Sequence, residues 1–177
     1  MDILATISGL LAVALFVFSY QLKARESIIV ANAASRILYV LQYLLLGALE
    51  GAILDTAAFF VSLLCKKSDA GFIKKHFLLT LILSNVFLIG LGMLTYQNIF
   101  SLLPIAGVVF ETLALWLKKE RHIRITSLLG APFWLAYNLK TAAYGSVVGN
   151  VITLISISVA ILRYDVLKKN ADASKKA

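Results

Sequence analysis

Four polar side chains that could do chemistry lie within long apolar stretches of this sequence. Arg36, Asp55 and Glu111 are charged, and Asn150 is an amide. At 1.5 Å per residue, Arg36 lies ~13 Å and Glu111 ~9 Å along a helix from the nearest basic loop, which puts them at similar depths. An unpaired charge is costly in hydrocarbon, so we expect these two to form a buried ion pair that acts as a structural bridge or a gate. Direct contact with a substrate and exposure to lipid are the alternatives.

A second group of polar side chains lies toward the other ends of these stretches. We expect it to line a polar vestibule on the outer side and to contact a small polar molecule. The group comprises Gln42, Asp55, Trp134, Asn138 and Asn150, with Tyr43 and Tyr137 beside them. The alternative is structural: the amides join neighbouring helices at about 1 kcal/mol each, and the tryptophan sits in the aromatic belt at the membrane interface.

No combination of residues suits catalysis or metal binding. The chain has one cysteine, Cys65, and two histidines, His76 and His122. One cysteine cannot form an intramolecular disulfide, and these three side chains are not spaced as metal ligands. No nucleophile can be matched with a base. We therefore expect no enzyme, no metal site and no cofactor.

The composition is that of an integral membrane protein. Apolar residues make up 60% of the chain and charged residues only 15%, which is too apolar for a soluble domain of this length. The net charge of +8 does not indicate nucleic acid binding, because the basic residues lie at the ends of apolar stretches, where they face lipid headgroups. The expected partner is the lipid bilayer.

The apolar stretches predict an all-α protein with seven transmembrane helices. The longest uncharged run, Phe77 to Phe110, would form a helix of ~51 Å and must therefore turn, most simply at the polar residues 95–98. A sixth, short span contains Pro132 and is expected to be kinked. The expected spans are residues 3–22, 28–48, 51–65, 77–94, 99–117, 125–139 and 141–162.

Lysine and arginine predict the orientation of these spans. They occur in the loops after the first, third and fifth spans and in the polar tail after the seventh, whereas Lys140 is the one basic residue in the other loops. Basic loops stay in the cytoplasm. The prediction is an N-terminus outside and a C-terminus in the cytoplasm.

The two halves of the chain share their spacing. At a constant offset of 95 residues, each span and turn of residues 1–67 falls on a counterpart in the second half, although few residues are identical. This predicts a first three-helix unit at 1–67, a basic loop and linker helix at 68–97, and a second unit with the polar cytoplasmic tail at 98–177. An odd helix between two such units makes them parallel, with any substrate site between them.

Several short motifs resemble those of one family. The stretch LQYLLLGALEGAILDTAAFFVSLL and the later FWLAYN and YGSVVGN resemble the YgjV-type bacterial inner-membrane proteins, whose layout is similar to that of SWEET facilitators, PQ-loop proteins and Pnu-type vitamin transporters. The resemblance implies two triple-helix bundles that rock about a central site. It places Asn150 at a substrate-binding asparagine, with Asp55 in place of the matching one. It also implies hinge prolines, found here only in the second bundle as Pro104 and Pro132.

Layout and buried polar residues together predict a function in the bacterial inner membrane. We expect a passive or ion-coupled facilitator for a small polar metabolite, which works by alternating access. A non-transporting membrane scaffold or partner subunit is the alternative. The identity of the metabolite and any association into homo-oligomers stay open at this stage.

Overall fold

The computed structural model describes residues 3–167, and every regular element in that range is helical. The elements are α1 (Ile3–Gln21), α2 (Arg25–Leu45), α3 (Leu49–Lys66), α4 (Gly71–Lys75), α5 (Phe77–Leu94), the 3-10 turn η1 (Ile99–Ser101), α6 (Leu102–Trp116), α7 (Glu120–Lys140), α8 (Tyr144–Ala160) and the π-helical turn η2 (Ile161–Leu167).

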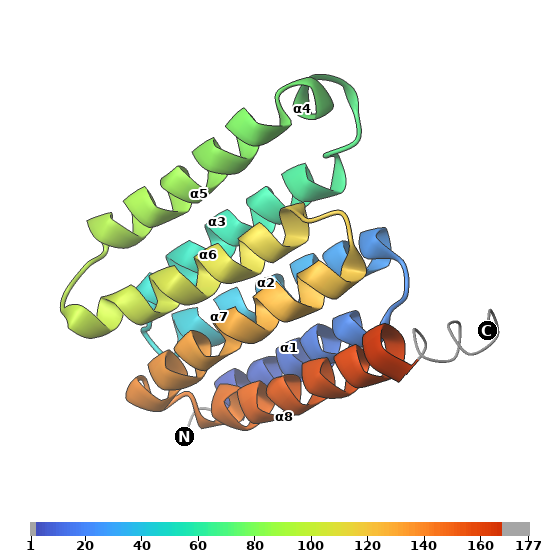
Figure 1. The fold of residues 1–177 in the computed structure, drawn as a ribbon. Coiled ribbons are helices and arrows are strands. Elements are labelled where there is room, and N and C mark those ends of the chain that lie inside the picture. Colours follow the sequence, from blue (N-terminus) through green and yellow to red (C-terminus); the bar gives the residue numbers. More distant parts are fainter. Residues whose placement is uncertain (1–2, 168–177) are drawn as a thin grey trace.

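The long helices form two layers that face each other (Figure 1). One layer contains α1, α2 and α3, side by side in chain order, and the other contains α6, α7 and α8. The layers meet along their edges, where α1 packs on α8 and α3 packs on α6. Helix α5 lies at one side of the molecule and contacts α3 and α6.

Five helical segments are long and apolar enough to cross a membrane. They are Ile3–Gln21, Arg25–Leu45, Phe77–Leu94, Ile99–Trp116 and Tyr144–Asp165. Long helices also occupy the other two expected positions. However, α3 carries Glu50, Asp55 and Lys66 within 18 residues, and the first turns of α7 are polar. The expected count of seven spans therefore stays a prediction, whereas several apolar helices are confirmed.

The turn expected in the long uncharged run is confirmed. Helix α5 ends at Leu94, and a side-chain cap at Asn98 starts the next helical segment. The Asn98 Oδ1 accepts a hydrogen bond from the Phe100 amide at 3.0 Å, and the Ser101 hydroxyl accepts one from the Asn98 amide at 3.2 Å. These bonds satisfy backbone amides that have no hydrogen-bond partner within the first turn of a helix.

Two expected loops are helical instead. Helix α7 begins at Glu120 and includes residues 120–124, which the sequence analysis placed in a basic loop. The reason is that Arg124 is buried: it forms an ion pair with Asp165 at 3.2 Å and stacks on the Tyr164 ring at 5.1 Å. The same contacts hold η2, so helical structure continues past residue 162, where we expected the tail to begin. The rest of that tail, residues 168–177, lies outside the described residues.

The offset of 95 residues also relates the observed helix bounds. Shifted by 95, α2 coincides with α7 at both ends, the end of α1 coincides with the end of α6, and the start of α3 coincides with the start of α8. Helix ends that match at a constant spacing are the pattern of a structural repeat.

The turns before α3 and α8 match in detail. Gly47 has a φ of +69° and its counterpart Ala142 a φ of +55°. The following amides, of Ala48 and Ala143, donate to the carbonyl five residues earlier at 2.9 and 3.0 Å. A left-handed residue, followed by an amide that donates to the carbonyl five residues earlier, is a common way to end a helix. At residue 142 this conformation is kept without glycine.

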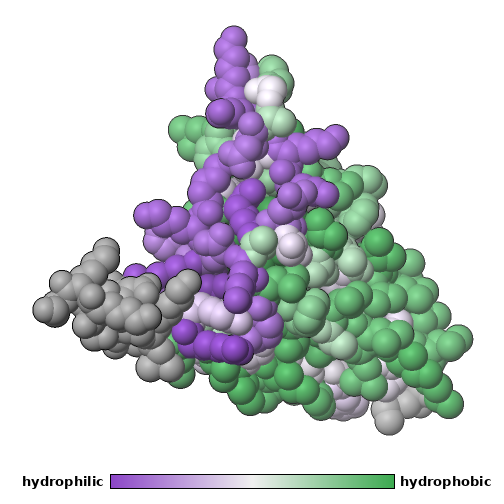
Figure 2. Space-filling view, turned by 90° about the vertical axis from the view of Figure 1, so that its right-hand side faces the viewer, coloured by the Kyte–Doolittle hydropathy of each residue, from purple (hydrophilic) through white to green (hydrophobic). Residues whose placement is uncertain are grey.

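Apart from the buried Arg36 and from Lys140, the described basic residues gather at one end of the molecule. Figure 2 shows hydrophilic side chains concentrated on this end, beside a broad apolar surface. Arg25 joins three helix termini here, because its guanidinium donates to the carbonyls of Leu115 and Leu117 at 2.8 Å and of Cys65 at 3.2 Å. A cation is favourable at the carbonyl ends of helices. We call this the basic end.

Candidate functional site

A small polar cavity lies between the two layers. All six long helices of the layers contribute to its lining, and the space open to water is about 20 Å³. That is enough for about one water molecule. The lining residues are Phe16, Arg36, Tyr39, Tyr43, Asp55, Glu111, Trp134, Asn138 and Asn150.

Eight of these nine residues form four pairs related by the offset of 95. Each pair contributes one side chain from each layer, so the two halves line the cavity with equivalent positions. The pairs are Phe16 with Glu111, Tyr39 with Trp134, Tyr43 with Asn138, and Asp55 with Asn150. The ninth residue is Arg36, whose counterpart is Ala131.

Contacts between the layers are reciprocal, as in a twofold-symmetric interface. The Ser146 hydroxyl on α8 donates to Gln42 Oε1 on α2 at 2.6 Å. In the equivalent place, the Gly51 amide on α3 donates to the Tyr137 hydroxyl on α7 at 3.2 Å. Residue 137 is the counterpart of residue 42, and residue 146 that of residue 51. The cavity therefore lies where the two halves meet about an approximate twofold axis.

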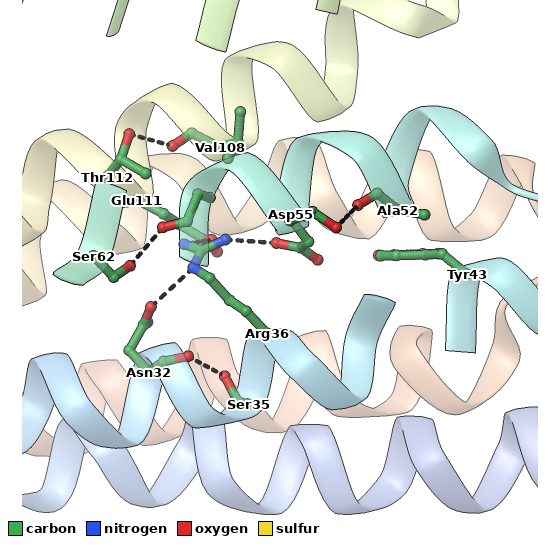
Figure 3. Close-up of polar contacts among 12 residues, drawn as sticks. Asn32, Ser35, Arg36, Tyr43, Ala52, Asp55, Ser62, Val108, Glu111 and Thr112 are labelled. Carbon is green, nitrogen blue, oxygen red and sulfur yellow. Dashed lines mark hydrogen bonds and ion pairs between the residues drawn. The ribbon is translucent and has the colours of Figure 1, made fainter. Parts of the chain in front are cut away.

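Arg36 is held by three polar partners (Figure 3). Its Nη1 donates to Asp55 Oδ1 at 2.5 Å and its Nη2 donates to Glu111 Oε2 at 3.0 Å. Its Nε donates to Asn32 Oδ1, one helical turn earlier, at 3.2 Å. Only 1% of the Arg36 side chain is exposed. A guanidinium that uses every nitrogen in this way has a fixed orientation.

The arrangement of these charges differs in one respect from the sequence expectation. Arg36 and Glu111 lie together, as their depths suggested. Asp55, which we expected in an outer vestibule with Gln42, instead binds Arg36. The reason is equal depth: Asp55 lies 11 residues from the end of α3 at Lys66, as far as Arg36 lies from the start of α2 at Arg25. The result is a buried triad of one guanidinium and two carboxyl groups.

The other expected site residues divide into two sets. Asn138 lines the cavity and accepts a hydrogen bond from the Tyr43 hydroxyl at 2.9 Å. Trp134 is only 6% exposed and stacks on the Tyr43 ring, with ring centres 6.1 Å apart. Trp134 is therefore packed against other side chains inside the protein and does not lie on its outer surface. Gln42 does not line this cavity; it lines a separate hollow between α1 and α8.

Two donors that line the cavity have no hydrogen-bond partner among the described residues. They are the Trp134 indole Nε1 and the Asn150 amide Nδ2, and both are buried. Buried donors in proteins are nearly always paired with protein groups, water or a ligand. These two atoms therefore indicate a place for an acceptor oxygen.

Three residues of the site were not expected from the sequence. Phe16 and Tyr39 line the cavity, and Asn32 holds Arg36. The offset of 95 could have found the first two, because they are the counterparts of Glu111 and Trp134. Asn32 could have been found by its position one turn before Arg36, where side chains on one helix meet.

The site contains no set of metal ligands among the described residues: no three His, Cys, Asp or Glu side chains in that range are grouped to hold an ion. The two carboxylates of the triad are engaged by Arg36. What the site offers is a mixed polar and aromatic lining that includes one guanidinium and two carboxyl groups.

A comparison with protein families finds one match that covers nearly the whole chain. The model of Imp-YgjV, described as a bacterial inner membrane protein, matches residues 3–168. No curated protein and no solved structure matches the chain.

Proposed function

Because this chain belongs to the Imp-YgjV family of bacterial inner membrane proteins, we propose that it is a transporter for a small polar solute. Helices α1–α3 and α6–α8 are two triple-helix bundles that lie parallel in the membrane, and α5 links them in a SWEET-like layout of seven transmembrane helices. The bundles rock against each other, so that the cavity opens first to one side of the membrane and then to the other. The protein carries out no enzymatic step.

One observation carries this proposal: four pairs of repeat-related residues line one buried polar cavity. Internal repeats in transporters place the substrate site at the interface between repeats, near the middle of the membrane. Polar residues buried within spans are costly, and they mark solute or ion pathways.

Contacts between the bundles close both ends of the cavity. At the basic end, Arg25 of the first bundle binds the carbonyls of Leu115 and Leu117 in the second. At the opposite end, Ser146 binds Gln42 and the Gly51 amide binds Tyr137. We assign this structure to an occluded state, because both sets are formed and the cavity has room for about one water. Breaking one set opens that end.

The residues that bind the solute are those with free or weakly held polar atoms at the cavity. Asn150 and Trp134 present N–H groups to an oxygen of the solute, and the aromatic face of Trp134 suits an apolar or ring portion. Asp55 and Asn138 contribute oxygens. Gln42 acts at the closing contact with Ser146 and not in the site itself.

The basic end faces the cytoplasm, in agreement with the preference of lysine and arginine for that side. The C-terminus is then cytoplasmic and the N-terminus outside. The lipid bilayer covers the apolar flanks, and any association of copies takes place within it.

The test is a search for solutes that bind the purified protein. Sugars, vitamins, amino acids and nucleosides are screened in detergent for a rise in melting temperature, and each hit is tested for uptake into proteoliposomes. Asn150→Ala should abolish the rise. The matched control is Asn85→Ala, which removes the same amide from α5, where Asn85 binds the carbonyl of Leu81. A blank across all four classes contradicts transport, as does equal binding by both variants.

A scaffold or partner subunit is the second candidate, and the exposure of α5 favours it. Only Ser84, Leu88 and Gly92 of this helix are buried, so a partner helix could pack along it. In that case substitutions on the α5 surface should abolish the cellular phenotype, whereas Asp55→Ala and Asn150→Ala should leave it intact.

A further inference from the structure

The charges of the buried triad do not balance. Arg36 contributes one positive charge, and Asp55 and Glu111 contribute one negative charge each when ionised. At most 7% of any of the three side chains is exposed, so water cannot screen the surplus. A buried charge without a counterion is costly, and proteins usually neutralise it by taking up a proton.

No other described charge near the triad supplies the missing cation. The groups that interact with it are the phenols of Tyr20, Tyr39, Tyr43 and Tyr137 and the thiol of Cys65 on α3, none of which is a cation. Phenols are neutral at physiological pH. The cavity residues from α7 and α8, Trp134, Asn138 and Asn150, are uncharged, and α5 has no titratable side chain.

We propose that the triad binds one exchangeable proton, shared between the carboxylates of Asp55 and Glu111, and that this proton is the ion coupled to transport. Uptake converts one carboxylate to a carboxylic acid and brings the net charge from −1 to 0. The described hydrogen bonds from Arg36 use one oxygen of each carboxylate, Oδ1 and Oε2. The second oxygen of either can therefore hold the proton.

The cavity offers a path for this proton. It is lined by both carboxylates and has space for about one water. Such a water can accept bonds from the unpaired donors of Trp134 and Asn150 and donate to a carboxylate, which gives it the two to four partners that a buried water needs. Opening of the cavity to one side of the membrane then exposes the proton to that side. Coupling rests on the proposed function, whereas proton binding does not.

Infrared spectroscopy of the purified protein tests the proton site without any solute. A carboxylic acid buried away from water gives a carbonyl band distinct from that of a carboxylate, and its area counts protons. The wild type should show one such acid per chain near neutral pH. Either Asp55→Asn or Glu111→Gln alone should remove the band, because the remaining carboxylate and Arg36 then balance. Both replacements keep an oxygen that can accept from Arg36.

The matched control is Glu50→Gln, which changes a carboxylate bound to Ser101 at the opposite end of the molecule and should leave the band unchanged. Absence of the band in the folded wild type overturns the proposal. So does loss of the band in only one of the two triad variants, since the proton would then belong to one residue and not to the surplus charge. A protein with the band that moves no solute keeps the proton site and fails as a transporter. A protein that transports a solute but shows no band keeps the proposed function and overturns the proton site.

Discussion

Tyr43 and Asn138 occupy the same position in the two halves of the chain and bind each other, with the Tyr43 hydroxyl donating to Asn138 Oδ1 at 2.9 Å. A residue that meets its own counterpart must lie near the axis that relates the two halves. This contact therefore marks the centre of the interface between the layers. It lies beside the stacked rings of Tyr43 and Trp134 at the cavity.

Tyr43→Phe should destabilise the fold, because it leaves the buried Asn138 oxygen without its donor while keeping the ring. The expected cost is about 1–3 kcal/mol. It is measured by unfolding in mixed detergent micelles. Tyr144→Phe is the control, since that side chain is 60% exposed. Equal stability of the two variants would show that the central contact contributes nothing.

Removal of Arg36 should be among the most damaging single changes. Arg36→Leu leaves Asp55 and Glu111 buried without a cation, and the expected loss is about 3 kcal/mol or more. The double variant Arg36→Leu with Glu111→Leu should recover only part of this, because Asp55 stays unpaired. The triple variant that also carries Asp55→Leu should recover much more. Strictly additive effects in this series, measured by unfolding, would rule out the triad as one coupled unit.

The triad also shows how far the sequence could predict the site. Depth along a helix was enough to put Arg36 and Glu111 together, because both distances follow from the helical rise. Depth would have placed Asp55 with them as well, because Asp55 lies 11 residues from Lys66 at the basic end of α3, as far as Arg36 lies from Arg25 at the basic end of α2. Counting Asp55 from the opposite end of its helix assigned it to the outer vestibule and hid this match.

The fold was predicted better at its long helices than at its junctions. The lengths of the apolar stretches located the seven long helices of residues 3–167. The constant offset of 95 anticipated the shared ends of α2 and α7, of α1 and α6, and of α3 and α8. The charged residues 120–124 were expected in a loop, but they belong to α7. Arg124 is buried there because it pairs with Asp165. That partner lies 41 residues away, and no local pattern in one sequence reveals it.

Close approach of α1 and α8 depends on Gly149. A Cβ added at this position would lie 2.0 Å from Val13 Cγ2, so Gly149→Ala must push the helices apart. The expected cost of such overpacking is about 1–3 kcal/mol. Gly90→Ala makes the same substitution on α5, where a Cβ meets nothing within 4 Å, and should be neutral or slightly stabilising. Melting temperatures of the two variants should therefore differ clearly, and a match between them would contradict this packing.

Asp69 should contribute a pH-dependent step at the basic end. The hydrogen bond from Lys118 lowers the pKa of the Asp69 carboxyl below its ordinary value, and the charges of Lys118 and Arg25 act in the same direction. Since the pKa is lower in the folded state, the stabilisation is present above the unfolded pKa of about 4 and is lost as pH falls through the folded pKa. The difference in melting temperature between wild type and Asp69→Asn should shrink over that range. A constant difference would contradict the linkage.

Alternating access predicts that weakening one closing contact opens one end only. Tyr137→Phe with Ser146→Ala removes two hydrogen bonds between the layers at the end opposite the basic end. At about 1 kcal/mol per bond, the population open to the outside should rise roughly thirtyfold. Asn150→Cys, in a Cys65→Ala background, reports this through its reaction with a membrane-impermeant maleimide added outside. The two substitutions should speed labelling from outside and slow it from the cytoplasmic side, because opening one end withdraws the population from the other. If labelling is unchanged from both sides while the melting temperature falls, these contacts support the fold and do not form a gate.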